Sequence, residues 1–351
     1  MTKTIGYAAQ SSTSALEPFH FERRKLTDYD VKMEILYSGI CHSDIHFLKD
    51  EWSIGKFPMV AGHEVLAKVT SVGDKVKTFK VGDIVAPSGI IDSCRECDEC
   101  LNNLEQYCQK GFVFMYNTFN KYLKGENYGG FSKQIVVDEK YVIHIPKKFK
   151  KEDYAAVVPL MCAGLTPYSA LKHLKIGKGH KVGIVGIGGL GHLAVKIAHA
   201  LGAHVVAITT TPDKKNDTQR LGASESILST NADEMKHHLK TFDFILSTVP
   251  VSHDLSIYLE LLKLDGTMSL LGLHKKHNKS FPSGLLSYER RALTGSVIGS
   301  TKEMKEMLEF CLEHNILADV EVVPIQKINE SFKRVVDKKV RYRCVIDMSS
   351  L

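Results

Sequence analysis

Apolar and polar residues alternate along the first part of the chain in the way that half-buried β-strands require. The alternation is clearest over residues 31–37, and short apolar stretches next to turn residues follow at 65–72, 79–86 and 134–137. A period of two residues places successive side chains on opposite faces of a sheet. The pattern predicts that residues 1 to about 150 are rich in β-strands.

From about residue 180 the pattern changes to short apolar runs that alternate with stretches of helical spacing. Repeated strand–helix–strand order implies a parallel, doubly wound sheet and therefore an α/β fold. The predicted strands are 182–185, 205–208, 241–248, 267–272 and 293–299, and the predicted helices are 193–201, 213–221 and 254–263. The tail adds a helix at 302–314 and strand-like residues at 320–323 and 343–347. We expect a first domain over 1–157, a second domain over 158–295, and a return to the first domain over 296–351.

A glycine-rich turn joins the first strand of the α/β part to its first helix. Gly186, Gly188 and Gly191 supply the pattern G-x-G-x-x-G, with Gly189 and Leu190 inside it. The first glycine permits a tight turn, the second lets the backbone approach a pyrophosphate, and the third lets the helix pack close to the strand. The helix N-terminus then offers N–H groups and a positive dipole end to phosphates. Inside a strand–turn–helix–strand unit the motif indicates a dinucleotide site, and a glycine turn without a ligand is the alternative.

The composition is that of an ordinary soluble protein, with 44% hydrophobic and 25% charged residues in a chain of 351. The net charge of +6 comes from scattered basic residues, so no nucleic-acid-binding face is expected. The lysine-rich pieces at 147–151 and 274–279 are expected to be solvated loops. The N-terminus lacks a signal-peptide core, and no apolar run is long enough to span a bilayer. We therefore expect a cytoplasmic protein without a membrane partner, whose eight cysteines are ligands or free thiols.

Four cysteines lie close together at Cys94, Cys97, Cys100 and Cys108. Four thiolates on one short lobe can close a tetrahedral zinc site with no open position, which makes the site structural. An iron–sulfur cluster is the alternative, because C-x2-C-x2-C also opens a bacterial ferredoxin motif. That motif continues with three residues, a cysteine and a proline, whereas here seven residues precede Cys108 and Gln109 follows it. The spacing therefore favours zinc.

A second set of metal-ligand residue types is dispersed along the chain. Cys41 lies in Gly-Ile-Cys-His-Ser-Asp-Ile-His, His63 lies in Gly-His-Glu, and Cys162 opens Cys-Ala-Gly-Leu-Thr-Pro-Tyr. Two thiolates and one imidazole on zinc would leave a fourth position open for a substrate. A buried cysteine is usually a small apolar side chain and a lone histidine is usually structural, so the residues alone leave both interpretations open. Cys311 and Cys344 are expected to be core or surface thiols.

In their order and spacing these motifs resemble the zinc-dependent medium-chain alcohol dehydrogenases over essentially the whole chain. Cys-His-Ser-Asp-x-His at 41–46, Glu51 with Trp52, and Gly-Ser-Val-Ile-Gly-Ser at 295–300 are similar to the cinnamyl alcohol dehydrogenase branch. The resemblance implies a β-rich, GroES-like catalytic domain, a Rossmann dinucleotide-binding domain, and a homodimer.

The resemblance also implies roles for the dispersed metal-ligand residues. Cys41, His63 and Cys162 would bind a catalytic zinc, and Glu64 would be a neighbour able to enter the coordination shell. Asp44 would orient one of these ligands from outside the shell. With the four-cysteine lobe, the protein would carry two zinc ions. Zinc would act as a Lewis acid on the oxygen of an alcohol or aldehyde while hydride passes to or from a nicotinamide.

Other site residues follow from the same resemblance. Ser43 and His46 stand where the family relays a proton, although either side chain could be merely structural. His42 resembles the residue that meets the pyrophosphate, and Thr166 stands among the cofactor-binding positions. Trp52, the only tryptophan, matches a substrate-pocket position, with an ordinary core tryptophan as the alternative.

The residues beyond the second strand of the dinucleotide unit favour NADP(H) over NAD(H). An NAD site usually places an acidic residue about 20 residues beyond the glycines, on the ribose hydroxyls. Here Thr209 stands at that position, followed by Thr210, Thr211 and Lys214. Hydroxyls and an ammonium group could bind a 2′-phosphate and would not repel it. Asp213 lies past the strand end and is expected to be an early helix residue.

We therefore expect an NADP(H)-dependent, zinc-containing alcohol dehydrogenase or aldehyde reductase that acts on small aromatic or aliphatic primary alcohols and aldehydes. A polyol dehydrogenase of the mannitol type, from the same branch, is the nearest alternative. A non-catalytic, zinc-containing nucleic-acid-binding protein is the alternative from another class. The scattered basic charge and the separate set of Cys41, His63 and Cys162 argue against it.

Overall fold

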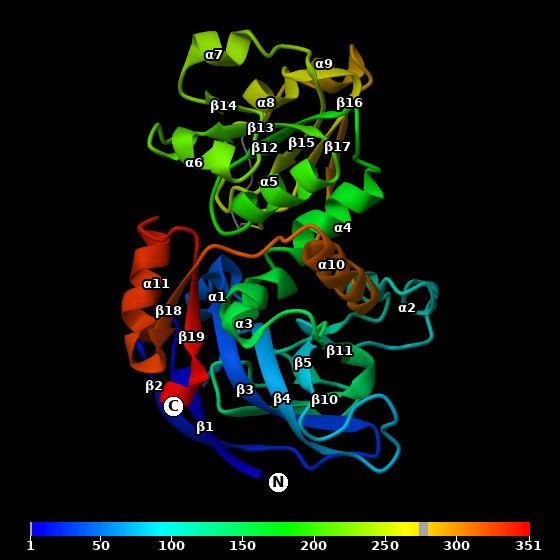
Figure 1. The fold of residues 1–351 in the computed structure, drawn as a ribbon, viewed down its shortest axis with the longest axis vertical. Coiled ribbons are helices and arrows are strands. Elements are labelled where there is room, and N and C mark those ends of the chain that lie inside the picture. Colours follow the sequence, from blue (N-terminus) through cyan, green and yellow to red (C-terminus); the bar gives the residue numbers. More distant parts are fainter. Residues whose placement is uncertain (1, 274–279) are drawn as a thin grey trace. The chain divides into compact units, whose positions relative to one another are not determined.

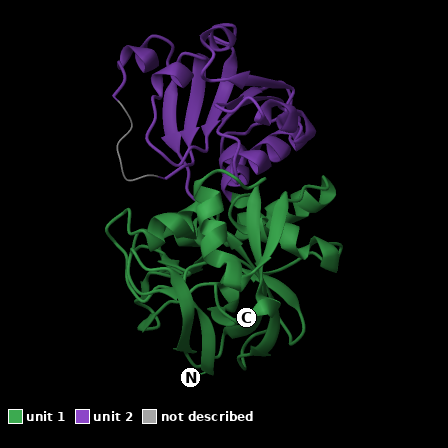
Figure 2. Cartoon of the chain, turned by 90° about the vertical axis from the view of Figure 1, so that its left-hand side faces the viewer, with its two compact units in different colours: residues 1–165, 298–351 green, residues 166–297 purple. Residues whose placement is uncertain are grey.

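The structure is a computed structural model that describes residues 2–273 and 280–351. The chain forms two compact units: the first is Met1–Leu165 with Ile298–Leu351, and the second is Thr166–Val297 (Figure 2). The second unit is therefore inserted between two segments of the first, which contains both ends of the chain. The lysine-rich piece at 274–279 lies outside the described residues.

The main sheet of the first unit is built around strand β3 (Asp30–Ile40). The strand order is β11-β5-β4-β3-β19-β18, and β10 also pairs with β3 (Figure 1). Strand β10 pairs with the first half of β3 and β19 with the second half, both antiparallel. Because β19 follows the second unit in the sequence, the tail returns to the sheet of the first unit. The other strands of this sheet are β4 (Glu64–Val72), β5 (Ile84–Pro87), β10 (Gln134–Asp138), β11 (Val142–His144), β18 (Val320–Pro324) and β19 (Arg343–Asp347).

Alternating burial explains why the first part of the chain forms strands. Val31, Met33 and Ile35 are buried on one face of β3, as the period of two predicts. Shorter strands form three further pairs, namely β1 (Thr2–Ala9) with β2 (Leu16–Arg23), β6 (Ile90–Asp92) with β7 (Val113–Phe114), and β8 (Phe119–Asn120) with β9 (Gly125–Glu126). The α-helices of this unit are α1 (His42–Leu48), α2 (Asp98–Leu101), α3 (Tyr154–Val157), α10 (Thr301–Glu313) and α11 (Ile328–Val336).

The second unit contains a parallel sheet with the strand order β14-β13-β12-β15-β16-β17. Every neighbouring pair is parallel, and the order grows outward from β12 in both directions, as in a doubly wound dinucleotide-binding fold. The predicted α/β class and parallel sheet are confirmed. The strands are β12 (Lys181–Val185), β13 (His204–Thr209), β14 (Glu225–Leu228), β15 (Phe242–Ser247), β16 (Leu262–Leu270) and β17 (Ala292–Gly295). The helices are α4 (Leu165–His173), α5 (Gly191–Ala200), α6 (Lys214–Arg220), α7 (Ala232–Lys236), α8 (Ser256–Leu259) and α9 (Gly284–Ser287).

Two predicted elements of the second unit are wrong in extent. The helix expected over 254–263 is limited to α8, and β16 already begins at Leu262 and continues through Asp265 and Gly266. Leu262 is buried and pairs with Phe242, so its burial comes from the sheet and not from a helix face. The register between β15 and β16 shifts before Thr267, which absorbs the Asp-Gly pair without ending the strand. The strand expected over 293–299 stops at Gly295.

Among the described residues, no single helix is long and apolar enough to cross a membrane. One bent pair of helical segments, Lys151–Met161 with Leu165–His173, passes the length and composition test when its two parts are taken together. Val157, Leu160 and Met161 of the first segment are buried in the protein.

Candidate active site and metal centres

Asp44, in the first turn of α1, accepts hydrogen bonds from four groups. Its Oδ2 accepts from the backbone N–H of Cys41, the N-cap of the helix, at 2.9 Å and so forms part of a capping box. Its Oδ1 accepts from the Gly62 N–H (3.1 Å), from Nδ1 of His63 (3.0 Å) and from the Tyr116 hydroxyl (2.7 Å). Because Nδ1 of His63 donates to this buried carboxylate, Nε2 is left as the nitrogen that can bind a metal.

Four side chains from three separate segments converge at one point of the first unit. Cys41 precedes α1, His63 and Glu64 stand at the start of β4, and Cys162 follows the 3-10 helix η4 (Val158–Met161). One ligand atom from each residue lies within 4.8 Å of the others, and all four residues are buried. The Sγ atoms of Cys41 and Cys162 are 4.0 Å apart. The fold thus brings together the three dispersed residues that the sequence singled out, with Glu64 beside them.

The electrostatics of this group suit a divalent cation. The hydrogen bond between the two buried thiols lowers the pKa of Cys41 and raises the pKa of Cys162. Burial alone would lower the pKa of His63, but the Asp44 carboxylate raises it above its usual value. A divalent cation would replace the protons of both thiols and of Nε2. Two sulfurs and an imidazole nitrogen are ligands that zinc takes in catalytic sites, so the residues fit a zinc ion.

Arg343, the first residue of β19, forms a buried ion pair with Glu64 that the sequence analysis missed. The guanidinium donates to Oε1 of Glu64, while Oε2 is buried without a hydrogen-bond partner. Burial raises the pKa of Glu64 to about 7, although the charge of Arg343 opposes this. An unpartnered carboxylate oxygen beside two thiols and an imidazole is a donor that a metal ion could use.

The residues expected to relay a proton lie on α1, next to the ligand group. The hydroxyl of Ser43 lies 3.8 Å from Sγ of Cys41. Nδ1 of His46 pairs with Oε2 of Glu51 at 2.6 Å, and Nε2 of His46 is buried without a hydrogen-bond partner. The Glu51 side chain is 40% exposed, so it joins the buried imidazole to solvent. The sequence analysis noted Glu51 only as a branch motif, and the structure gives it a direct partner.

Aromatic side chains gather beside the ligand group. The ring of Phe114 lies 5.3 Å from that of His63 and 5.6 Å from that of Phe47. The ring of Trp52 in turn lies 4.8 Å from Phe47 and 5.1 Å from His46. Trp52 is therefore linked to the candidate active site through these rings, and it is only partly buried. Phe114 was not expected from the sequence, because it has no motif of its own.

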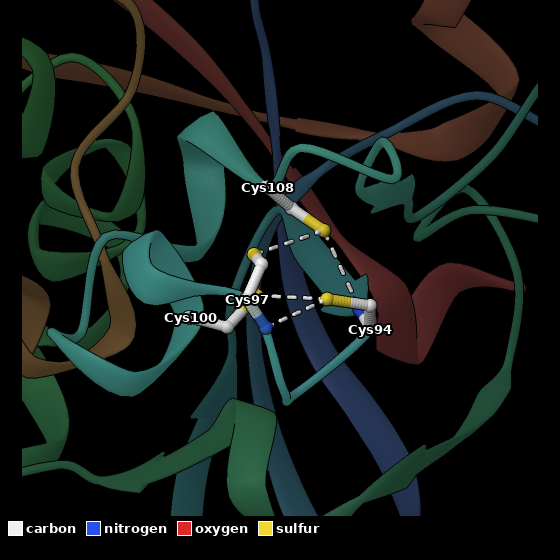
Figure 3. Close-up of side chains that lie close together, drawn as sticks. All are labelled: Cys94, Cys97, Cys100 and Cys108. Carbon is white, nitrogen blue, oxygen red and sulfur yellow. Dashed lines mark hydrogen bonds between the residues drawn. The ribbon is translucent and has the colours of Figure 1, made fainter.

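The four-cysteine lobe forms a second, separate metal centre in the first unit. The sulfurs of Cys94, Cys97, Cys100 and Cys108 face one another, with one ligand atom from each within 4.8 Å of the rest (Figure 3). Backbone N–H groups point at two of the sulfurs, from Cys97 to Cys94 (3.3 Å) and from Cys94 to Cys108 (3.5 Å). The backbone N–H of Glu96, together with that of Cys97, lowers the pKa of Cys94 to about 6, which favours a thiolate. A closed set of four sulfurs fits a structural zinc ion.

The glycine turn of the second unit has the shape that a dinucleotide requires. Gly186 has a positive φ of 88°, which side chains rarely adopt. A β-carbon on Gly191 would lie 1.9 Å from the carbonyl oxygen of Gly186, so only glycine allows this approach of helix α5 to strand β12. A β-carbon on Gly188 would meet no atom within 4 Å, which leaves open space at the backbone where a pyrophosphate would lie. The turn therefore fits a dinucleotide.

The loop after β13 lies over this turn. Nζ of Lys214 donates to the carbonyl oxygen of Ile187, inside the glycine pattern, at 2.7 Å. Thr209 is buried and its hydroxyl oxygen accepts from the Thr211 N–H at 3.2 Å, whereas Thr210 is exposed. Asp213 precedes α6, in agreement with the expectation that it is an early helix residue.

Two other predicted cofactor residues lie at helix starts. Thr166 is the second residue of α4 and is buried. His42 is the first residue of α1 in the first unit, and its ring lies 5.0 Å from that of His46. Burial, together with the charge of His46, lowers the pKa of His42, which favours the neutral imidazole.

Comparison with known proteins gives the class to which this fold and site belong. Residues 27–147 match the alcohol dehydrogenase GroES-like domain, and residues 189–313 match the zinc-binding dehydrogenase family. The chain is 47% identical over 349 residues to "Aldehyde reductase YahK" of Escherichia coli, covering 99% of each chain. Among solved structures it is similar to the cinnamyl alcohol dehydrogenase SbCAD4 from Sorghum bicolor, with a TM-score of 0.95 and 36% identity over 99% of this chain and 98% of that chain. It is also similar to "CAD from Helicobacter pylori complexed with NADP(H)", with a TM-score of 0.92 and 38% identity over 99% of this chain and 98% of that chain.

The GroES-like part, the Rossmann part and the metal-ligand sets together define a zinc-binding dehydrogenase. The chain belongs to the zinc-dependent medium-chain alcohol dehydrogenases, oxidoreductases that move hydride between an alcohol or aldehyde and a nicotinamide cofactor. The expected family, fold and enzyme class are confirmed.

Proposed function

We propose that the protein is an NADP(H)-dependent alcohol dehydrogenase and aldehyde reductase with its catalytic zinc at Cys41, His63 and Cys162. The convergence of these three buried residues with Glu64, at ligand distances from one another, is the observation that carries the proposal. Cys94, Cys97, Cys100 and Cys108 would hold a second, structural zinc.

Residues around the metal ligands orient them and balance their charge before the reaction. Asp44 fixes the tautomer of His63 through Nδ1 and holds the backbone of Cys41, so that sulfur and nitrogen point at one position. Arg343 offsets the negative charge of Glu64 and of the thiolates. When bound, zinc polarises the oxygen of the substrate as a Lewis acid, and NADP(H) supplies or accepts the hydride.

The proton that accompanies hydride transfer moves along α1. In alcohol oxidation, Ser43 accepts the hydroxyl proton from the substrate and releases its own. Nε2 of His46, which has no hydrogen-bond partner among the described residues, takes up a proton through a bridging water. His46 releases a proton from Nδ1 to the partly exposed Glu51, and thence to water. In aldehyde reduction the same groups work in reverse.

NADP(H) is the cofactor that the loop after β13 favours. The strand ends in Thr209, which has no charge to repel a phosphate, and Lys214 is held against the glycine turn by its hydrogen bond to Ile187. The exposed hydroxyl of Thr210 is available for a further hydrogen bond. The similar Helicobacter pylori enzyme, which carries NADP(H), supports the same choice.

Aromatic aldehydes are the substrates that the surroundings of the catalytic metal favour. Phe47, Phe114 and Trp52 offer ring faces near His63, and aromatic pairs add attraction beyond the burial of apolar area. The names of the similar enzymes, an aldehyde reductase and two cinnamyl alcohol dehydrogenases, support this class.

A substrate panel with both cofactors tests this function. Cinnamaldehyde, an aliphatic aldehyde, their alcohols and mannitol are each assayed with the phosphorylated and unphosphorylated cofactor. We expect the highest kcat/KM for cinnamaldehyde with NADPH. Mannitol as the best substrate would favour the polyol alternative. No turnover, together with a salt-dependent shift of labelled RNA or DNA, would favour the nucleic-acid-binding alternative.

We also propose a cytoplasmic location and a homodimer. All eight cysteines are free thiols, and thiol ligands persist where the compartment is reducing. The dimer is expected from the family resemblance, and the sedimentation of the purified protein would measure it.

A further inference from the structure

The four-cysteine lobe, residues 94–108, contacts helix α10. These contacts are not needed to bind a metal ion. Glu105 and Gln106 lie in the 3-10 helix η1 (Glu105–Tyr107), directly before the ligand Cys108. Oε1 of Glu105 accepts from the backbone N–H of Thr301 at 2.6 Å, across 196 residues of sequence. Nε2 of Gln106 donates to Oε2 of Glu303 at 3.4 Å. Both lobe residues are buried, although they carry long polar side chains.

These contacts complete the N-terminus of α10. The first N–H groups of a helix have no partner within the helix. Ser300 caps the N–H of Glu303 with its hydroxyl at 3.1 Å, and Glu303 in turn accepts from the Ser300 N–H at 2.9 Å. This capping box leaves the first helical N–H, that of Thr301, to Glu105. A buried carboxylate there also lies at the positive end of the helix dipole.

The segment just before this cap reaches Gly89, a glycine that also lies beside the candidate active site. A β-carbon on Gly89 would lie 3.2 Å from Cδ1 of Ile298, 3.5 Å from Cε2 of Phe114 and 3.9 Å from Cδ2 of His63. The side chains of Ile298, Phe114 and His63 therefore gather around Gly89, which places Ile298 close to the aromatic ring of Phe114 and to a proposed zinc ligand. Ile298 stands only three residues before Thr301, so the position of the helix start determines the position of its side chain.

We propose that Glu105 is a positioning residue through which the metal-bound lobe caps α10 and holds Ile298 in the wall of the active site. Zinc on the four cysteines would fix η1, η1 would place Glu105, and Glu105 would fix the first turn of α10. The four-cysteine site, which touches no substrate, would in this way influence which substrates fit. The effect on substrates rests on the function proposed above, whereas the contact of Glu105 with the helix does not.

Hydrogen exchange of the zinc-loaded protein tests the contact without an activity assay. In Glu105→Ala, the amides of residues 301–303 should exchange about 2- to 30-fold faster, as expected for the loss of a helix cap. Glu105→Gln keeps an acceptor and should restore at least part of the protection. Glu96→Ala is the matched control, because Glu96 belongs to the same lobe but pairs with Lys110 at its surface. It should leave these amides unchanged.

Kinetics and metal content then separate positioning from a general loss of structure. Glu105→Ala should keep the wild-type zinc content and the kcat for a small aldehyde, while the KM for cinnamaldehyde rises several-fold. Unchanged exchange at 301–303 in Glu105→Ala, or an equal change in Glu96→Ala, would overturn the proposal. Loss of zinc from Glu105→Ala would also overturn it, because Glu105 would then support the lobe and not the helix. If the wild type reduces no aldehyde, the proposed function fails, and the exchange data still decide whether Glu105 caps α10.

Discussion

Among single residues, Asp44 does most to position the proposed catalytic metal ligands, because one carboxylate accepts hydrogen bonds from both Cys41 and His63. Asp44→Asn keeps the shape but cannot accept every one of these hydrogen bonds. We expect the affinity for the catalytic zinc to fall about 10- to 100-fold, as for other partners of metal-bound histidines. Competition with a chelator measures this affinity. Asp28→Asn, which alters an exposed pair with Lys75, is the control. Equal zinc affinity in both variants would contradict the role of Asp44.

In the proposed function, Lys214 is the residue on which the choice of cofactor should depend most. Its ammonium group donates to the glycine turn, within reach of a nucleotide held there. A charge-assisted hydrogen bond to a 2′-phosphate contributes roughly 1.5–3 kcal/mol, so Lys214→Ala should reduce kcat/KM for NADPH about 10- to 150-fold and change that for NADH little. Lys215→Ala is a close control, because Lys215 is already paired with Glu234 at 2.7 Å.

Thr209→Asp should reverse the preference between the two cofactors. A carboxylate at the end of β13 would repel the 2′-phosphate of NADPH and could accept hydrogen bonds from the ribose of NADH. Steady-state kinetics with both cofactors, at fixed ionic strength because salt screens an exposed phosphate site, measure the change. A wild type that prefers NADH, or a ratio of the two kcat/KM values that Lys214→Ala leaves unchanged, would show that the loop has been misinterpreted.

Among the helices, α1 is the one that would combine the proposed metal binding with the proposed proton transfer. Its N-cap is Cys41, and Ser43 and His46 follow on it. His46→Ala should slow turnover by about 10²-fold, the low end for general acid–base catalysis because water can substitute, and should change the pH dependence of kcat. His20→Ala, on an exposed position of β2, controls for the loss of an imidazole. An unchanged pH–rate profile with unchanged kcat would make His46 a structural residue.

The four-cysteine lobe depends on its metal, because its buried cluster consists of the cysteines themselves. Leu101 and Tyr107 are 67% and 46% exposed, so these large apolar side chains give the lobe little core. Cys97→Ser should lose one zinc and lower the midpoint of thermal unfolding by roughly 5 °C or more. Cys41→Ser also loses one zinc but should lower its midpoint less, because Ile40, Ile45 and Leu48 around it belong to the buried apolar core. Equal midpoints in the two variants would contradict a structural role for the lobe.

At the scale of the whole molecule, local patterns in the sequence predict the fold, but they do not reveal contacts between residues that lie far apart in the sequence. The glycine turn and the parallel sheet were predictable because strand period, turn residues and helix spacing are all local. The helix expected over 254–263 is too long because Leu262 pairs with Phe242 of the neighbouring strand β15, which the spacing alone does not reveal. Arg343 lies 279 residues from Glu64, and Glu105 lies 196 residues from Thr301. Neither contact has a sequence motif, because only the tertiary fold creates it.

The rate of NADPH oxidation by cinnamaldehyde, with zinc counted in the same samples, tests the central claim most directly. The wild type should carry about two zinc ions, as its two ligand sets imply, and should oxidise NADPH. Cys41→Ser should retain about one zinc, stay folded and lose this activity. A wild type with both zinc ions that reduces no aldehyde, a Cys41→Ser variant that keeps the wild-type rate, or iron in place of zinc would contradict the account.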